Sequence, residues 1–362
     1  MKHSYLLLGI TSGRLSRLLV KNGFSFTPKI IFRIFFLAQS SLWASIFKRS
    51  EKRKLKKKLE KYEMPDDPVF IIGHWRTGST LLHQLMSLDD QLVAPTVFQV
   101  SVPDSFLVSE KYYKPVMTRA MRPKRPMDNV ALGFYEPQED EYALVKLAPE
   151  SPLEKLIFPE NKTYFLKNYD DFIPSDETRE KWKKALYIFC KRLSYPSGKR
   201  VLLKNPFHSM RIPLLLEMYP GAKFIHIHRH PYKVVPSTIH MWNIISKENK
   251  LRSRKLSFEV QDIVAVLNRM LSTIRQQMNL IPQDAKAEVS FRELQNDPVK
   301  TLKQVYNQLG LHYSPEFDAK LKARLSAMKF YQKNNYELSE TDKRIIKNGL
   351  KEHFEYYNYE AY

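Results

Sequence analysis

One stretch constrains the fold of this chain more than any other, residues 67–86, which read DPVFIIGHWRTGSTLLHQLM. The apolar run Val69 to Ile72 predicts a buried strand, and Gly73 to Thr80 follows it as a tight glycine loop. A helical spacing of apolar residues comes next, at Leu81, Leu82, Leu85 and Met86. Such a junction presents unpaired backbone N–H groups and the positive end of a helix dipole to one point, which favours a bound phosphate.

The loop nearly matches the Walker A pattern in its spacing, G-x-x-x-x-G-[ST]-T, but Ser79 stands where that pattern has its lysine. The sequence therefore argues against an ordinary ATP or GTP hydrolase. Arg76, inside the loop, still supplies a cation that can fork onto phosphate oxygens.

Length and composition predict one large globular domain with an N-terminal extension, because 362 residues can bury one substantial core and 43% of them are hydrophobic. The formal net charge of +21 favours anionic partners. No helix-turn-helix, zinc-finger or RNP pattern accompanies this charge, so we expect no nucleic-acid partner. Cys190 is the single cysteine, which fits a reducing compartment and a cytoplasmic protein.

The predicted extension, residues 1–66, carries most of the excess charge, since its first 60 residues hold 14 Lys or Arg against two Glu. Its apolar segments lie between residues 4 and 47, and Arg33 breaks the longest of them, which argues against a transmembrane helix. Two interpretations stay open. The segments form an in-plane amphipathic helix, peripheral on the inner membrane face, or they form helices that cover the main domain. In the first case the side chains facing anionic headgroups are Arg14, Arg17, Lys21, Lys29 and Arg33.

A basic run at residues 50–68 predicts a solvated helix or linker, and the main domain is expected at residues 67–362. Within this domain, Val201 to Leu203 reads as a buried strand that ends in Lys204. A lysine there lies where open α/β sheets bind ligands, at the carboxyl ends of the strands. The alternative is a lysine that faces solvent.

Lys223 to His228 predicts a third strand, which runs into Arg229, with Ser237 about two turns into the following helix. Both side chains could reach one anion. Ala287 to Phe291 predicts a short fourth strand. We therefore predict an α/β fold with a central, mainly parallel sheet flanked by helices and a P-loop-like nucleotide site.

A proline-rich stretch, residues 92–138, predicts loops and short helices of the kind that build substrate pockets. At its end, Pro137-Gln138-Glu139-Asp140-Glu141 precedes an apolar run. This is an ordinary helix start with acids that complement the dipole, or it places a general base near an acceptor hydroxyl. Nothing around the histidines at 226, 228 and 230 supplies an obvious zinc ligand set, and we predict no metal site.

Taken together, these segments resemble the family of sulfotransferases that use 3'-phosphoadenosine 5'-phosphosulfate (PAPS), and its bacterial and tyrosylprotein-type branches more than its cytosolic branch. The resemblance covers about residues 67 to 312 in four blocks: WRTGSTLL at 75–82, LLKNPF at 202–207, RHPYKVVPS at 229–237 and FRELQNDPVKTLKQVYNQLGL at 291–311. The first and third blocks are specific when they occur together.

The resemblance implies a role for each block. The 5'-phosphosulfate would be held by the first loop, through Arg76, Thr77, Gly78, Ser79 and Thr80. Arg229 and Ser237 would hold the 3'-phosphate, and Lys204 matches a lysine near the transferring group. Phe291 stands at the place of an adenine-binding tyrosine. The family works without a metal, because fixed positive groups stabilise the loose transition state of an in-line sulfuryl transfer. The nucleotide product of the transfer is PAP.

The chain departs from the family at the group that takes the acceptor proton. Pro206 stands at the place of the cytosolic catalytic histidine, and no acid lies between residues 95 and 99, where the tyrosylprotein-type glutamate would fall. A base is still required. Our nominations, in order, are Glu139, then Glu141 and Asp140, then His208 and His83.

The sequence thus predicts a sulfotransferase that transfers the sulfuryl group of PAPS to a small-molecule hydroxyl. The apolar, basic N-terminus favours a lipophilic alcohol such as a sterol or lipid, and a glycan or phenol is the alternative acceptor. Two other classes stay open, a P-loop nucleotide kinase and a non-catalytic membrane-surface module. The sequence leaves the oligomeric state undetermined.

Overall fold

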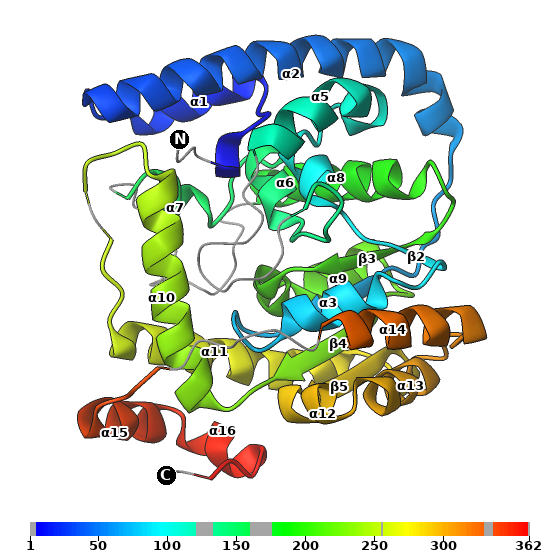
Figure 1. Cartoon of the computed structure of the whole chain (residues 1–362), viewed down its shortest axis with the longest axis vertical. Helices are drawn as coiled ribbons and strands as arrows, with labels where there is room; N and C mark the ends of the chain where they lie inside the picture. The colour runs from blue at the N-terminus through cyan, green and yellow to red at the C-terminus, as the bar shows by residue number, and fades with distance from the viewer. Residues whose placement is uncertain (1–4, 121–132, 160–175, 255, 329–335, 361–362) are drawn as a thin grey trace.

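The structure is a computed structural model, and it describes residues 5–120, 133–159, 176–254, 256–328 and 336–360. At its centre is a sheet of five strands in the order β2-β3-β1-β4-β5, and every neighbouring pair is parallel (Figure 1). The strands are β1 Val69–Ile72, β2 Leu92–Val93, β3 Arg200–Lys204, β4 Lys223–His228 and β5 Lys286–Ser290. The predicted α/β fold is confirmed, and β2 is a strand that the sequence did not predict.

The strands bury both of their faces. In β1, Phe70 and Ile72 join one hydrophobic cluster, whereas Val69 and Ile71 join another on the opposite side. Because successive side chains of a strand point to opposite faces, a parallel sheet made of such apolar runs needs a covering layer on each side.

Helices supply these two layers. One face is covered by α3 Ser79–Met86, α12 Phe291–Asn296, α13 Pro298–Gln308 and α14 Pro315–Ala327. On the other face, one continuous hydrophobic cluster joins the sheet to α4 Val97–Ser101, α5 Phe106–Ala120, α6 Glu141–Leu147, α7 Glu154–Ile157, α8 Asp176–Ser194, α9 Ile212–Met218, α10 Pro231–Asn249, α11 Val260–Gln277, α15 Glu340–Gly349 and α16 Lys351–Tyr356. Short 3-10 helices complete the described elements: η1 Tyr5–Leu7, η2 Pro206–Met210, η3 Met278–Leu280 and η4 Gln283–Ala285.

The proline-rich stretch holds more regular structure than expected. Its helix α5 has 15 residues with Pro115 inside it, longer than the short helices that the prolines predicted. Residues 121–132 of this stretch lie outside the described part of the chain. At the end of the predicted fourth strand, Phe291 already belongs to α12.

The N-terminal extension forms a layer at one end of the molecule, made of α1 Ser12–Asn22 and α2 Pro28–Lys61 (Figure 1). Leu15 and Leu37 are buried in the same hydrophobic cluster as Phe70 of the central strand. The interpretation that these helices cover the main domain is therefore confirmed. The boundary predicted after residue 66 falls between α2 and β1.

Two of the basic residues expected at a membrane surface face the protein instead. Arg14 donates from Nη2 to Glu154 Oε1 at 3.1 Å, and Arg33, which is 5% exposed, donates from Nη1 to the carbonyl oxygen of Lys250 at 2.9 Å. The expectation that these two arginines face headgroups is wrong, because each satisfies a buried acceptor of the domain.

Candidate functional site

The segments singled out in the sequence converge at one edge of the sheet. The glycine loop follows β1, Lys204 ends β3, Arg229 follows β4 and Phe291 follows β5. These four strands are neighbours in the order β3-β1-β4-β5 and run parallel, so their carboxyl ends lie side by side. Open α/β sheets bind ligands at such an edge.

The glycine loop has a backbone that only glycine adopts easily at two points. Gly73 has φ 138°, and a Cβ there would lie 2.4 Å from the carbonyl oxygen of Ile227, so the loop passes directly against β4. Gly78 has φ 101°, and its Cβ would lie 2.1 Å from Cδ2 of Phe291. Both glycines therefore permit close packing of the loop on the neighbouring strand ends. This cradle, with α3 beginning at Ser79, fits the phosphate site that the sequence predicts.

Hydrogen bonds from side chains hold the loop in place. Ser209 Oγ accepts the backbone N–H of Gly73 at 2.8 Å, and Thr77 Oγ1 donates to the carbonyl oxygen of His74 at 2.8 Å. Thr77 and Ser79 are buried, and Thr80 is half-buried in the first turn of α3. The hydroxyl residues predicted for the site thus lie at the start of this helix.

Arg76 links the loop to the second predicted anion site. It has φ 68°, a left-handed conformation that is uncommon outside glycine, and its Nε donates to Ser237 Oγ at 2.8 Å. Arg229 donates from Nη1 to the carbonyl oxygen of Arg76 at 3.1 Å, and its guanidinium carbon lies 4.4 Å from the centre of the Phe291 ring. Arg76 therefore contacts Ser237 and Arg229, and Arg229 contacts the Phe291 ring. The residues predicted for the different parts of one nucleotide lie next to one another.

Lys204 and Glu139 form an ion pair at the end of β3. The lysine side chain is 2% exposed and the glutamate side chain 17% exposed, so the pair is largely withdrawn from water. The interpretation of Lys204 as a solvent-facing lysine is wrong. Glu139 was the first nomination for the proton acceptor, and the structure brings it to the lysine that was nominated for the transferring group.

The two acids that follow Glu139 point elsewhere. Asp140 Oδ2 lies 2.9 Å from Nε2 of His208, and both side chains are fully buried. Burial by itself raises the pKa of Asp140, but His208 and an amide hydrogen bond from Asn205 outweigh it and hold the pKa below its ordinary value. Asp140 therefore carries a negative charge inside the fold.

Glu141 is also fully buried, and three side chains satisfy it. Arg211 and Asn205 each donate to its Oε2 at 2.8 Å, and Ser151 donates to Oε1 at 2.7 Å. Sequence reasoning missed Arg211 and Ser151, although Asn205 lies inside the LLKNPF block. Together these contacts fix the start of α6 against the end of β3.

The last nomination, His83, is a poor proton acceptor in this fold. It is 1% exposed, and burial, with the Lys204 ammonium adding to it, lowers its pKa to about 3. An imidazole with so low a pKa takes up a proton weakly near neutral pH.

Of the alternating histidines, His226 and His228 lie in β4 and His230 follows it, and the last two contact the C-terminal tail, which the sequence did not foresee. The ring of His228 stacks on Tyr357 with centroids 3.9 Å apart, and His226 Nδ1 lies 2.8 Å from Glu288 Oε1. His230 Nε2 lies 2.9 Å from the carbonyl oxygen of Glu360. Among the residues that the structure describes, no group of three or more His, Cys, Asp or Glu side chains could hold a metal ion.

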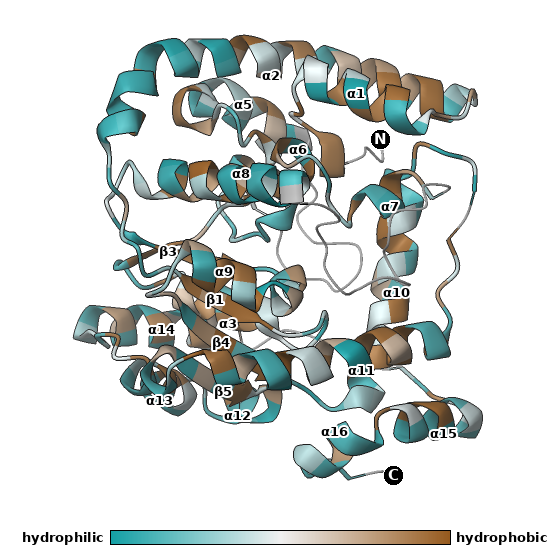
Figure 2. Ribbon diagram, turned by 180° about the vertical axis from the view of Figure 1, so that it is seen from behind, coloured by the Kyte–Doolittle hydropathy of each residue, from teal (hydrophilic) through white to brown (hydrophobic). Residues whose placement is uncertain are grey.

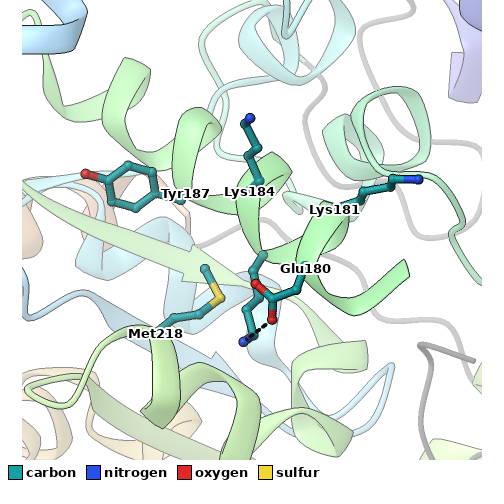
Figure 3. Close-up of a pocket in the computed structure, with 6 residues that line it drawn as sticks. Glu180, Lys181, Lys184, Tyr187 and Met218 are labelled. Atoms are coloured by element: carbon teal, nitrogen blue, oxygen red, sulfur yellow. Dashed lines mark hydrogen bonds and ion pairs between the residues drawn. The ribbon is translucent and has the colours of Figure 1, made fainter. Parts of the chain in front are cut away.

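The open recess in Figure 3 lies on another part of the surface, between α8 and α9. Its volume is about 500 Å³, and it is lined by Glu180, Lys181, Lys183, Lys184, Tyr187 and Met218. Lys183 donates to Glu180 at 2.6 Å and also pairs with Glu217, so its charge is neutralised. The recess contains none of the residues at the strand ends and is not the candidate site.

Comparison with known proteins shows the family of the chain. The model of the sulfotransferase family matches residues 68–315. An omega-hydroxy-beta-dihydromenaquinone-9 sulfotransferase, Stf3 of Mycobacterium bovis, is 32% identical over 297 residues, which are 82% of this chain and 76% of that protein. The Stf3 of Mycobacterium tuberculosis matches with the same figures.

Solved structures show the same fold. The crystal structure of sulfotransferase STF9 from Mycobacterium avium superposes with a TM-score of 0.69 at 16% identity and covers 97% of each chain. Sulfotransferase STF1 from Mycobacterium tuberculosis gives a TM-score of 0.58 at 16% identity, over 93% of this chain and 90% of that one.

Proposed function

The chain belongs to the sulfotransferase family, whose members take the sulfuryl group from PAPS, and from this premise we propose that it sulfates the hydroxyl of a lipophilic alcohol. The relative that is 32% identical is named for a menaquinone-derived acceptor with an omega-hydroxyl group. We therefore favour a hydroxyl carried by an isoprenoid or similar lipid over a sterol, a phenol or a glycan.

The nucleotide site proposed here is the cradle at the strand ends. Arg76, Thr77, Gly78, Ser79 and Thr80 would hold the 5'-phosphosulfate, and Arg229 with Ser237 would hold the 3'-phosphate. Phe291, which packs on Gly78 and under Arg229, would offer its ring to adenine. The contacts among Arg76, Ser237 and Arg229 support this proposal, because the Arg76 side chain reaches Ser237 and the Arg229 guanidinium reaches the backbone of the loop, so the two anion sites adjoin. When bound there, PAPS supplies an electrophilic sulfur and a phosphate leaving group.

The ion pair of Lys204 and Glu139 is the observation that carries the proposed chemistry. The Glu139 side chain is 17% exposed, and in this proposal its carboxylate would accept the proton of an incoming hydroxyl. The Lys204 ammonium would stabilise negative charge on oxygen at the reacting centre. Because both side chains are largely withdrawn from water, these electrostatic effects are stronger than they would be at the surface.

An acceptor panel with sulfur-labelled PAPS tests this function. The panel contains an omega-hydroxylated isoprenoid quinone, a sterol, a simple phenol and an oligosaccharide, each offered to the whole chain and to Glu139→Gln as a catalytic blank. We expect label to enter the organic phase with the hydroxylated isoprenoid and to be lost in the variant. Sulfation of the phenol or the oligosaccharide alone would refute the lipophilic acceptor, and phosphoryl transfer from ATP with magnesium would refute sulfuryl transfer itself.

A further inference from the structure

Helix α2 has two faces of opposite character. Its inner face is buried at a spacing of three, four and seven residues, at Ile30, Arg33, Leu37, Ser41, Ala44 and Glu51. The last of these anchors the helix, because Glu51 Oε2 accepts the backbone N–H of Leu107 at 3.0 Å and its Oε1 lies 2.6 Å from Nη2 of Arg192. The inner face thus packs on the globular domain, as the buried face of an amphipathic helix does.

The outer face of the same helix is apolar and exposed over its N-terminal half. Here the outer stripe means six side chains that are 47% to 60% exposed: Ile31, Phe32, Phe35, Leu42, Trp43 and Ile46. Four of them, at 31, 35, 42 and 46, recur every four or seven residues, so they share one side of the helix, opposite the buried side. Val20 in α1 and Phe26 just before α2 are also exposed, at 87% and 80%. A soluble domain rarely exposes a contiguous set of this kind without a partner.

The outer side becomes strongly basic toward the C-terminal half of the helix. Arg49, Arg53 and Lys57 follow Ile46 at steps of three and four, so they continue the same side. A recess in this half is lined by cations, namely Arg49, Lys52, Arg53, Lys54, Lys56, Lys57 and Lys58. Figure 2 shows the change of character along α2, brown in its N-terminal half and teal beyond it.

We propose that the outer side of α2 lies flat on an anionic lipid bilayer, with the outer stripe in the boundary between headgroups and acyl chains and the basic half on the headgroups. A helix that binds in the plane of such a bilayer needs apolar side chains to bury and cations to contact the headgroups. The outer side of α2 carries both. Trp43 suits this position, because tryptophan prefers the membrane interface.

Two other occupants of this surface fit less well. By length and composition, α2 is a candidate membrane-spanning helix among the described residues. Spanning would pull the buried Arg33 and Glu51 away from the domain groups that satisfy them. A second copy of the chain that docked through the same side would meet like charge. Helix α2 has two acids: Glu51 is buried, and Glu60 lies 3.8 Å from Lys56.

The proposed membrane-binding surface is separate from the transfer site, but the two are connected through the fold. Helix α6, which begins immediately after Glu139 and Asp140, contacts η1, the segment that leads into α1. The docked layer is therefore connected to the side of the site where we place the acceptor hydroxyl. A chain held on the bilayer would meet a membrane-borne acceptor without first drawing it through water.

Vesicle binding of the full chain tests this proposal independently of turnover. The vesicles are phosphatidylcholine alone or phosphatidylcholine with phosphatidylglycerol, and bound protein is measured by sedimentation. We expect binding to the anionic vesicles that salt weakens. The Phe35→Ser/Trp43→Ser double variant should lower the partition coefficient by about 10-fold or more, and Arg53→Glu/Lys57→Glu should remove the preference for anionic lipid. A matched control is Tyr187→Ser/Ile188→Ser on α8, where the side chains are 43% and 41% exposed.

Tryptophan fluorescence reports the orientation. Of the four tryptophans, Trp75, Trp182 and Trp242 are at most 4% exposed, whereas Trp43 is 60% exposed. Brominated lipid should therefore quench the emission of the wild type by way of Trp43, and Trp43→Phe should abolish the quenching. Equal vesicle binding by the stripe variant and the wild type overturns the proposal. So does a wild-type dimer that depends on the stripe and ignores vesicles, or retention of the chain in membranes at alkaline pH, which marks a spanning helix.

Discussion

Removing the Arg229 side chain gives the sharpest test of the nucleotide site. Its proposed effect on nucleotide affinity can be measured separately from the effect of its protein contacts on stability. Its guanidinium lies 4.4 Å from the Phe291 ring and donates to the carbonyl oxygen of Arg76 at 3.1 Å. Arg229→Ala would remove a charge-assisted hydrogen bond to a 3'-phosphate, about 1.5 to 3 kcal/mol, which is a loss of roughly 10- to 150-fold in affinity.

The measurement is calorimetric titration with two nucleotides, 3',5'-ADP and 5'-AMP, which differ in the phosphate that Arg229 is proposed to hold. In Arg229→Ala the affinity for 3',5'-ADP should fall by the full factor. The affinity for 5'-AMP should fall only a few-fold, since the hydrogen bond to Arg76 that steadies the loop is worth about 0.5 to 1 kcal/mol. Loss of the contact with the Phe291 ring should lower the free energy of unfolding by about 0.5 to 1 kcal/mol.

A neighbouring arginine provides the control. Arg292 is exposed on the first turn of α12, so Arg292→Ala removes the same charge from the vicinity without removing a contact of the site. It should change neither affinity by more than about twofold, as expected for a screened surface charge. If Arg229→Ala weakened both nucleotides equally, or neither, the assignment of Arg229 to the 3'-phosphate would be refuted.

Three further substitutions probe other parts of the structure. Glu139→Gln should leave the affinity for PAP intact while steady-state turnover falls on the order of 100-fold, and full turnover would assign the base to another residue. Gly78→Ala places a Cβ 2.1 Å from Phe291 at φ 101°, so we expect a loss of about 1 to 3 kcal/mol in the free energy of unfolding, and unchanged chemical denaturation would contradict this packing. Burial raises the pKa of Glu154 from 4.5 to about 7, against the opposing effect of Arg14. Between these two values the native state binds more protons than the unfolded state, so this group makes stability fall as pH rises, and Glu154→Gln should flatten that fall in denaturation curves from pH 5 to 7.5.

Local patterns in the sequence were sufficient for the strands that build the site. The strand Val69 to Ile72 and the strand Lys223 to His228 have the predicted bounds, because a short run rich in apolar residues that ends near a glycine or proline turn specifies its own ends. The convergence of Arg76, Arg229 and Ser237 also follows from motif spacing once the strands are parallel neighbours. In contrast, β2 has two residues and forms only through its pairing with β3, which no local pattern encodes.

Contacts between distant segments set the limit of sequence reasoning. Nothing near Arg14 or Arg33 reveals that each points into the fold, because the acceptors are 140 and 217 residues away along the chain. The stacking of His228 on Tyr357 depends in the same way on where the C-terminal tail returns. The basic run after residue 50 predicted a solvated helix or linker, but not that the helix which begins at Pro28 continues through it to Lys61.

The three consecutive acids Glu139, Asp140 and Glu141 each contact a different partner, although the sequence offered one interpretation for the whole run. At the start of a helix, neighbouring side chains point about 100° apart, so a run of acids cannot face one partner. Asp140 turns to His208 and Glu141 to Arg211, and these buried contacts fix the first turn of α6 as an ordinary helix start fixes a helix. Glu139, one residue earlier, is left beside Lys204 at the edge where the glycine loop lies. The two buried acids thus support the start of the helix, and the proposed base is the acid of the three whose side chain stays partly exposed, at 17%.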